Sequence, residues 1–332
     1  MIKHKLTALL IVFVAAILVS AANLPVSAIT STNTGGGNGF RISPLTTDLT
    51  INAGQTQTAP IFVENITGTL VNVQVLFNDF TASNNESGQP ELLLNPNQYA
   101  PSHSLKRYLA PISDFILQPG VEKQINISIT IPTGTAGGGY YGAVRFAPVS
   151  TSSGRTVTLS ASVASLILVR VPGNVVDDLQ LASLDVRQNS NGSPQAIFFS
   201  NKNLIVAARF QNLGNVQEQP FGKVLLESSK KDLASYEINN SVPRGNVLPG
   251  SVRMFTINLT NIGVIGKYTV LGNFGYGTNG QLLSGSTTFY VIPLTLVVAV
   301  IVIVLLILFL IFGLPRLIRS YNRRVIRRAR HL

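Results

Sequence analysis

The sequence contains no cysteine and no tryptophan among its 332 residues, and it has only three histidines. A chain without cysteine forms no disulfide, which suits a bacterial exterior better than a eukaryotic secretory pathway. His4 and His331 lie near the two ends, so His103 is the only histidine in the central part. One histidine supplies neither a zinc site nor a Ser-His relay, and we interpret His103 as a surface or capping residue.

Other catalytic patterns are missing as well. There is no Gly-x-Ser-x-Gly motif and no cluster of acidic residues with metal-ligand spacing. Asp177-Asp178 is the only adjacent acidic pair; we interpret it as a solvated linker, with a calcium-bridged hinge as the alternative. A facing pair of carboxylates for glycoside hydrolysis would arise only by accident of folding from Asp79, Glu86, Glu91 and Asp114. We therefore expect no enzyme activity, no cofactor and no metal.

Basic residues are concentrated at the two ends of the chain. The sequence carries 25 Lys and Arg against 14 Asp and Glu, a formal net charge of +11. Two lysines stand in the first five residues and seven arginines stand after residue 315, which leaves 16 basic residues against 14 acidic ones in between. The middle of the chain is therefore close to neutral, and the overall charge does not indicate binding to nucleic acid.

The longest apolar run, from Leu294 to Leu314, has no charged residue in twenty-one positions. As an α-helix rising about 1.5 Å per residue it reaches roughly 31 Å, which matches the hydrocarbon core of a bilayer. The side chains of this helix are apolar on every face, whereas a helix of a soluble domain needs only one apolar face. We therefore assign residues 291–314 to a transmembrane helix.

Seven arginines follow the span within residues 315–332, at Arg316, Arg319, Arg323, Arg324, Arg327, Arg328 and Arg330. Basic residues next to a span stay in the cytoplasm, so we expect a single-pass plasma-membrane protein whose amino-terminal part is extracellular. Apolar residues at helical spacing between the arginines favour a tail that lies on the inner leaflet. A disordered flank that only fixes topology fits the pattern equally well.

The first 28 residues have the pattern of a secretory signal peptide. Basic residues precede an apolar run over positions 6–19, and a Val-Ser-Ala triplet ending at Ala28 supplies the small residues that signal peptidase accepts. We predict cleavage after Ala28; cleavage after Ala22 and an uncleaved anchor are the alternatives. Residues 29–39, rich in Gly, Ser, Thr and Asn, are predicted to be a flexible leader.

Between these ends, apolar and polar residues alternate in several stretches. Apolar side chains occupy every second position from Val71 to Phe77 and from Ile125 to Ile131, and the pattern returns after residue 204. A period of two predicts strands with one buried face. We predict an all-β exterior of two immunoglobulin-like sandwiches, residues 40–172 and 173–290, with one helical turn over 104–109.

Short segments of the first half recur in the second. The sequence Leu-Gln-Pro-Gly at 117–120 returns as Leu-Pro-Gly at 248–250, and Glu64-Asn65 returns as Gln211-Asn212 before a turn. These matches predict the duplication of one sandwich.

A glycine-rich segment from Gly137 to Gly142 encloses two tyrosines. It lacks the Lys-Ser/Thr and the helix of a phosphate loop, and we interpret Gly137 to Gly142 as a tight turn in which backbone approaches backbone. Gly134 to Gly139 is likewise predicted to be a turn between strands. Tyr140 and Tyr268 stand at the place of a tyrosine corner, so we favour a packing role for them. The alternative is a groove edge that binds an extended glycan or peptide, formed by Gly137, Gly138, Gly139, Tyr140 and Tyr141.

These motifs carry a resemblance to a known family. The first half resembles the first domain of WxL-interacting proteins at Ala53-Gly54-Gln55, Ser104 to Tyr108, Leu117 to Gly120 and Gly137 to Gly142. The second half is similar to their second domain at Phe210 to Asn215, Pro220 to Gly222, Val247 to Ser251 and Tyr276-Gly277. The order of leader, two β domains, single span and basic tail also matches that family.

The resemblance implies a cell-surface scaffold whose first domain contacts peptidoglycan and whose second engages another surface or host protein. This chain has no tryptophan, so any aromatic platform for a sugar must be tyrosine or phenylalanine. We expect a non-catalytic, membrane-anchored bacterial scaffold or adhesion protein, with the lipid bilayer, peptidoglycan and other surface proteins as partners. The alternative is an assembly chaperone or subunit that pairs a strand with its partner, and a wall-active enzyme is disfavoured.

Overall fold

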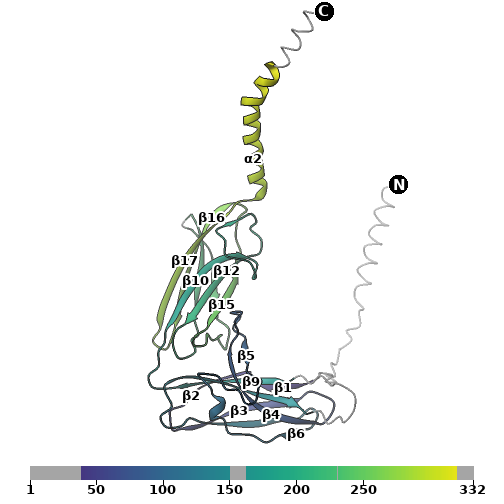
Figure 1. The fold of residues 1–332 in the computed structure, drawn as a ribbon, viewed down its shortest axis with the longest axis vertical. Coiled ribbons are helices and arrows are strands. Elements are labelled where there is room, and N and C mark those ends of the chain that lie inside the picture. Colours follow the sequence, from purple (N-terminus) through teal and green to yellow (C-terminus); the bar gives the residue numbers. More distant parts are fainter. Residues whose placement is uncertain (1–38, 150–161, 230, 320–332) are drawn as a thin grey trace, which may run out of the picture. The chain divides into compact units, whose positions relative to one another are not determined.

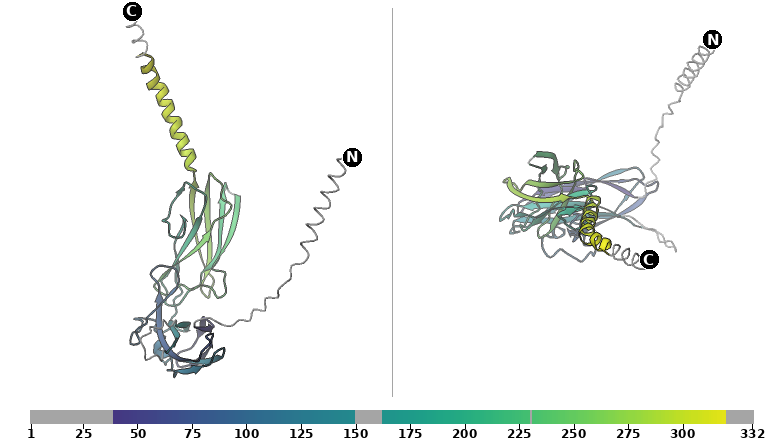
Figure 2. Two further views of the ribbon diagram at one scale, coloured as in Figure 1. Left: turned by 90° about the vertical axis from the view of Figure 1, so that its right-hand side faces the viewer. Right: turned by 90° about the horizontal axis from the view of Figure 1, so that it is seen from above.

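The computed structural model describes residues 39–149, 162–229 and 231–319, which form two β-sandwiches followed by one apolar helix (Figure 1). This arrangement confirms the predicted fold class. Figure 2 shows the same ribbon from two further sides. The predicted signal peptide with its cleavage site at Ala28, and residues 29–38 of the predicted leader, lie outside the described residues.

The first sandwich packs a three-stranded sheet against a six-stranded one. The smaller sheet has the antiparallel order β1-β3-β7, formed by β1 (Phe40–Ser43), β3 (Thr56–Asn65) and β7 (Glu122–Thr130). The larger sheet has the order β2-β9-β8-β4-β5, with β6 (Phe115–Leu117) on β4; its other strands are β2 (Thr46–Thr50), β4 (Val71–Ala82), β5 (Pro90–Leu92), β8 (Gly138–Pro148) and β9 (Val163–Val171). A 3₁₀ turn at Lys106–Tyr108 confirms the predicted helical turn.

The predicted alternation of apolar and polar residues matches the side chains that form the core of this sandwich. Ile127 and Ile129 of β7 are fully buried, whereas Asn126 between its isoleucine neighbours is exposed. Burying each isoleucine side chain contributes about 1.5–3 kcal/mol. The turns predicted for Gly134 to Gly139 and for Gly137 to Gly142 are wrong from Gly138 onwards, because these residues belong to β8 and pair with β9.

The second sandwich has the same two-layer construction. One sheet has the order β10-β12-β15, formed by β10 (Leu179–Gln188), β12 (Leu204–Asn212) and β15 (Val252–Asn258). The other has the order β11-β17-β16-β13-β14; its strands are β11 (Ile197–Phe198), β13 (Phe221–Ser228), β14 (Lys231–Ile238), β16 (Gly266–Tyr276) and β17 (Gln281–Val291). β17 therefore extends one residue past position 290, where we ended the second domain.

The repeated segments form the same set of buried hydrogen bonds around an asparagine in both sandwiches. Asn65 and Asn212 are fully buried, and their Nδ2 groups donate to the carbonyls of Leu117 at 3.0 Å and Val247 at 2.8 Å. In each sandwich the asparagine carbonyl also accepts a hydrogen bond from the glycine of the following Pro-Gly turn, at 2.8 and 2.9 Å. These matched contacts agree with a duplicated sandwich, since a buried amide must find partners for its polar atoms.

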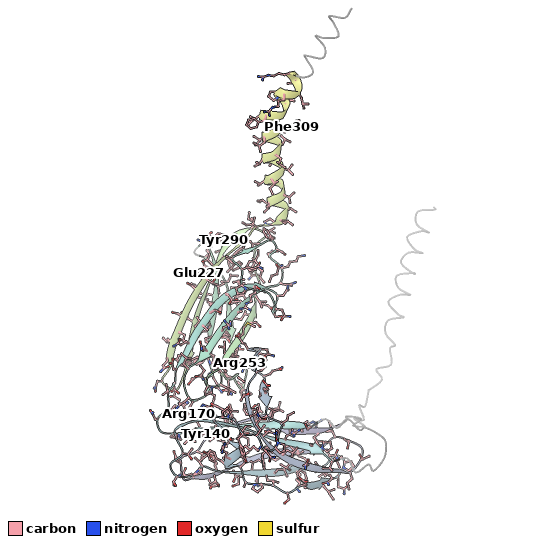
Figure 3. All side chains as sticks on the ribbon, in the orientation of Figure 1. Tyr140, Arg170, Glu227, Arg253, Tyr290 and Phe309 are labelled. Carbon is pink, nitrogen blue, oxygen red and sulfur yellow. The ribbon has the colours of Figure 1, made fainter. Side chains whose placement is uncertain are left out.

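The carboxy-terminal helix begins at Leu294. It consists of α2 (Leu294–Leu308), a π-helical turn η2 (Phe309–Gly313) and a last stretch to Arg319. Its side chains, among them Phe309, project on all sides in Figure 3, and none of them is buried. The helix Leu294–Arg319, with 26 residues, is long and apolar enough to cross a membrane. Arg316 and Arg319 lie in the last turns, and the other five tail arginines lie outside the described residues.

Candidate functional site

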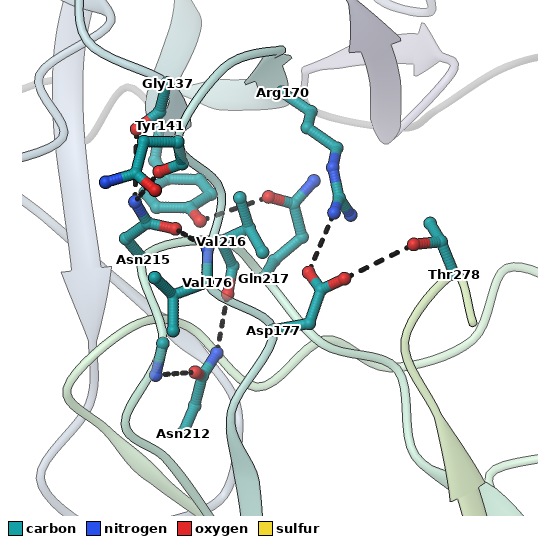
Figure 4. A network of polar contacts seen from close by, with 12 residues as sticks. Gly137, Tyr141, Arg170, Val176, Asp177, Asn212, Asn215, Val216, Gln217 and Thr278 are labelled. Atoms are coloured by element: carbon teal, nitrogen blue, oxygen red, sulfur yellow. Dashed lines mark hydrogen bonds and ion pairs between the residues drawn. The ribbon is translucent and has the colours of Figure 1, made fainter. Parts of the chain in front are cut away.

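The predicted binding segment lies where the two sandwiches meet. The Gly139 amide donates to the Asn215 carbonyl at 2.7 Å, and the Asn215 side-chain amide donates to the Gly137 carbonyl at 3.1 Å (Figure 4). A Cβ atom on Gly137 would lie 2.7 Å from the Asn174 nitrogen and 2.9 Å from Gly173. The close approach of backbone to backbone that we gave as one interpretation is therefore present at Gly137. Ligand binding by this segment stays a prediction.

The two tyrosines of the segment have different surroundings. Tyr141 is buried, and its Oη donates to Gln217 Oε1 of the second sandwich at 3.1 Å. Tyr140 is half-buried, and its Oη donates to the Ala136 carbonyl, four residues upstream, at 2.9 Å. Burial raises the pKa of both phenols above the ordinary value of tyrosine. Neither hydroxyl is therefore an acid or base at neutral pH.

The expected packing role of the tyrosine corners is confirmed by their hydrogen bonds. Besides the bond of Tyr140, the Gly263 amide donates to Tyr268 Oη at 2.8 Å, so each tyrosine reaches the main chain upstream of it. His103 Nδ1 lies 2.6 Å from the Gly139 carbonyl, to which it donates. This contact agrees with the capping role expected for that histidine.

The interpretation of Asp177-Asp178 as a solvated linker is wrong for Asp177. Its side chain is only 11% exposed, and its Oδ1 lies 2.7 Å from Arg170 Nη2 of β9. Thr278 Oγ1 donates to the other carboxylate oxygen at 3.3 Å (Figure 4). The partner of Asp177 is thus a guanidinium, and no group of three metal-ligating residues occurs in the part of the chain that the structure describes.

Glu218 is the least expected residue of this junction. It is 2% exposed, and its Oε1 has no hydrogen-bond partner within the described ranges. Burial, together with the neighbouring Asp177 carboxylate, raises its pKa from the usual 4.5 to about 7. No sequence pattern marks Glu218, because its burial depends on the second sandwich lying against the first.

A recess of about 360 Å³ opens beside Glu218. Its polar lining comes from both sandwiches, with Asp48, Arg170, Gln217, Glu218, Arg244 and Thr278. Burial raises the pKa of Asp48 as well. The recess offers carboxyl, amide and guanidinium groups for hydrogen bonding to a ligand.

A hairpin arm forms a second connection between the sandwiches. The loop between β4 and β5 carries Glu86, whose carboxylate accepts from Arg209 Nε at 2.7 Å and from a second nitrogen of the same guanidinium. The Glu86 carbonyl accepts from the Met254 amide of β15 at 2.8 Å. The hydrogen bonds from Arg209 lower the pKa of Glu86. Both sandwiches therefore contact each other at the arm as well as beside Gly137.

Neither a protein-family model nor a curated protein matches the sequence. Among solved structures, the chain is similar to the class 5 fimbriae chaperone CfaA, with a TM-score of 0.36 and 15% identity over 76% of this chain and 99% of that chain. The YadV chaperone has a TM-score of 0.32 and 14% identity over 75% of this chain and 99% of that chain. The E. coli chaperone DraB has a TM-score of 0.33 and 13% identity over 77% of this chain and 96% of that chain. Likenesses this distant carry no argument about function.

Proposed function

We propose that this chain is a non-catalytic bacterial surface scaffold that α2 anchors in the plasma membrane. Its two sandwiches, connected at the Gly137 segment and at the Glu86 arm, present one binding body outside the cell. This double connection carries the proposal, because it lets residues of both sandwiches contribute to one surface, as they do in the recess beside Glu218. The arginines that follow the helix support a cytoplasmic tail.

The resemblance to WxL-interacting proteins supports different binding roles for the two domains. In this proposal the first sandwich contacts peptidoglycan and the second engages another surface protein. Tyr99 of the first sandwich is 43% exposed, and the charged groups of Lys106 and Arg107 lie 4.7 and 4.5 Å from its ring centre. The two cations lie over the ring, and the part of the aromatic surface that they leave open is the proposed contact for a sugar.

Binding to purified cell walls and to surface-protein extracts tests the proposal. The soluble fragment must end no earlier than Ile292, since Phe289 and Val291 of β17 are fully buried. We expect residues 29–292 to be retained by walls and to capture a surface protein. Absence of both kinds of binding would contradict the proposed function, and release of soluble wall fragments would point to an enzyme instead.

Strand pairing with a partner is the second candidate, and the outer edge of β7 favours it. Asn126 lies opposite Pro60, which has no amide hydrogen, so the main chain of Asn126 points away from β3. On this edge, the Ser128 carbonyl accepts a hydrogen bond from the Ala110 amide at 3.0 Å. Within the described residues, Gln124 and Asn126 have no main-chain partner on that side.

The variant Asn126→Pro separates the two candidates. Proline removes the outward amide hydrogen and fixes φ of this edge residue, whereas Asn126→Ala keeps that amide and serves as the control. If a partner pairs with β7, co-purification of the partner falls with proline and persists with alanine. Equal co-purification by both variants would leave the scaffold proposal as the better one.

A further inference from the structure

The end of the second sandwich next to α2 exposes a group of large apolar side chains. The exposed fractions are 50% for Ile197, 56% for Phe199, 64% for Val264, 58% for Ile265 and 40% for Tyr290. We call these five residues the apolar collar. Single exposed apolar residues need no explanation, but a group at one end of a domain marks an interaction surface.

Strand pairing brings the five residues of the apolar collar to the same end. Ile197 is the partner of Tyr290 in the parallel pair of β11 and β17, and Phe199 follows β11 directly. Gly266, which begins β16, is the partner of Val291, so Val264 and Ile265 lie at this end too. The Asn201 side-chain amide donates to the Ile262 carbonyl at 2.8 Å and thereby joins the two loops of the collar.

The apolar collar is also close to the start of the helix. Only Ile292 and Pro293 separate the end of β17 from Leu294. Three extended residues span at most roughly 11 Å, so the collar cannot lie far from the first turn of α2. The Ile292 amide donates to the Phe198 carbonyl at 2.9 Å, which holds this short connection against β11.

We propose that the apolar collar lies in the interface of the bilayer that α2 spans, with its side chains between lipid headgroups and acyl chains. The inference rests on the membrane anchoring of the proposed function. Tyrosine prefers this interfacial depth, and Lys267, whose ammonium lies 6.0 Å from the Tyr290 ring centre, provides a cation for anionic headgroups. The exposed Lys202 follows Phe199 within the same loop and adds a second cation.

This contact with lipid would do more than cover apolar surface. A sandwich connected by two residues to a single helix would otherwise be free to tilt about that connection. Contact of Phe199 and Val264 with the interface adds attachment points beside the helix, so that the second sandwich rests on the membrane and the first one points to the wall.

The absence of tryptophan makes a direct test possible. Single-tryptophan variants of the full chain are reconstituted in vesicles, with and without lipids brominated near the headgroup or deep in the acyl chain. Phe199→Trp and Val264→Trp report on the collar, and Leu305→Trp reports on the helix. Val242→Trp is the control, since Val242 is 97% exposed and follows β14 at the opposite end of the sandwich.

We expect blue-shifted emission and quenching by headgroup-brominated lipid for Phe199→Trp and Val264→Trp, and none for Val242→Trp. Leu305→Trp should be quenched by lipid brominated deep in the acyl chain. If Leu305→Trp is quenched but the two collar variants behave like Val242→Trp, the inference is overturned while the anchoring stands. If Leu305→Trp is not quenched, the anchoring itself fails.

Discussion

The carboxylate of Glu86 in the first sandwich accepts a hydrogen bond from the guanidinium of Arg209 in the second, with 2.7 Å between Oε2 and Nε. The residues are 123 positions apart in the chain. Glu86 has the left-handed backbone conformation, with φ of 59°, at the tip of a hairpin that reaches from β4 to β15. The contact connects the two domains in addition to the chain itself and to the hydrogen bonds of the Gly137 segment.

Glu86→Gln is expected to weaken this connection. The two side chains are 27% and 32% exposed, so we expect a loss of about 1 kcal/mol in the free energy of unfolding of the fragment 29–292. Glu64→Gln is the matched control, because Glu64 pairs with Arg41, whose side chain is 67% exposed. This substitution should lower the free energy of unfolding by less than about 0.5 kcal/mol. Equal losses in urea denaturation would show that the arm contributes nothing specific.

The buried Glu218 predicts a pH dependence of stability. Its folded-state pKa of about 7 lies above the usual 4.5, so the folded state binds the proton more tightly than the unfolded state does. Stability is therefore highest below about pH 4.5 for this group and is lost as the pH rises through 7. The loss is at most about 3 kcal/mol by the usual conversion of pKa shifts.

Glu218→Gln should remove this dependence. The neutral amide carries no charge to bury, so the difference in unfolding free energy between pH 5 and pH 8 should shrink relative to the unmodified fragment. Glu122→Gln, on the exposed start of β7, is the control and should leave the profile unchanged. A profile for Glu218→Gln parallel to the unmodified one would contradict the assigned pKa.

Gly137→Ala tests whether the glycine segment is packed. The added Cβ would lie 2.7 Å from the Asn174 nitrogen, so we expect a loss of roughly 1–3 kcal/mol in stability. Gly68→Ala is the control, since a Cβ atom there would have no neighbour within 4 Å. If thermal denaturation shows no cost for Gly137→Ala, the segment is open and the groove interpretation gains support.

Tyr99→Ala tests the proposed contact with the wall. Loss of the exposed ring should weaken the retention of the fragment 29–292 by purified walls, because stacking on a sugar needs an aromatic face. Leu94→Ala changes another exposed apolar residue of the same loop, 57% exposed, and should bind like the unmodified fragment. Sedimentation with walls measures both, and identical retention would exclude Tyr99 as a contact.

The sequence was informative where a local pattern decides the structure. Alternation placed Ile127 and Ile129 inside, since the strand period acts over a few residues. The repeated asparagine motif predicted a duplicated sandwich, but the buried hydrogen bonds of Asn65 and Asn212 were found only in the structure. The junction was not predictable in the same way. Glu86 and Asp177 acquire their partners, and Glu218 its burial, only when the two sandwiches lie against each other, and no spacing in the chain encodes that contact.

Protease treatment of protoplasts that carry the chain with a carboxy-terminal epitope tests the membrane arrangement most directly. If α2 spans the membrane with the arginine tail inside, added protease digests both sandwiches and leaves a protected fragment that contains the helix and the epitope. Loss of the epitope with survival of the sandwiches would contradict the proposed orientation and, with it, the binding of wall and surface partners.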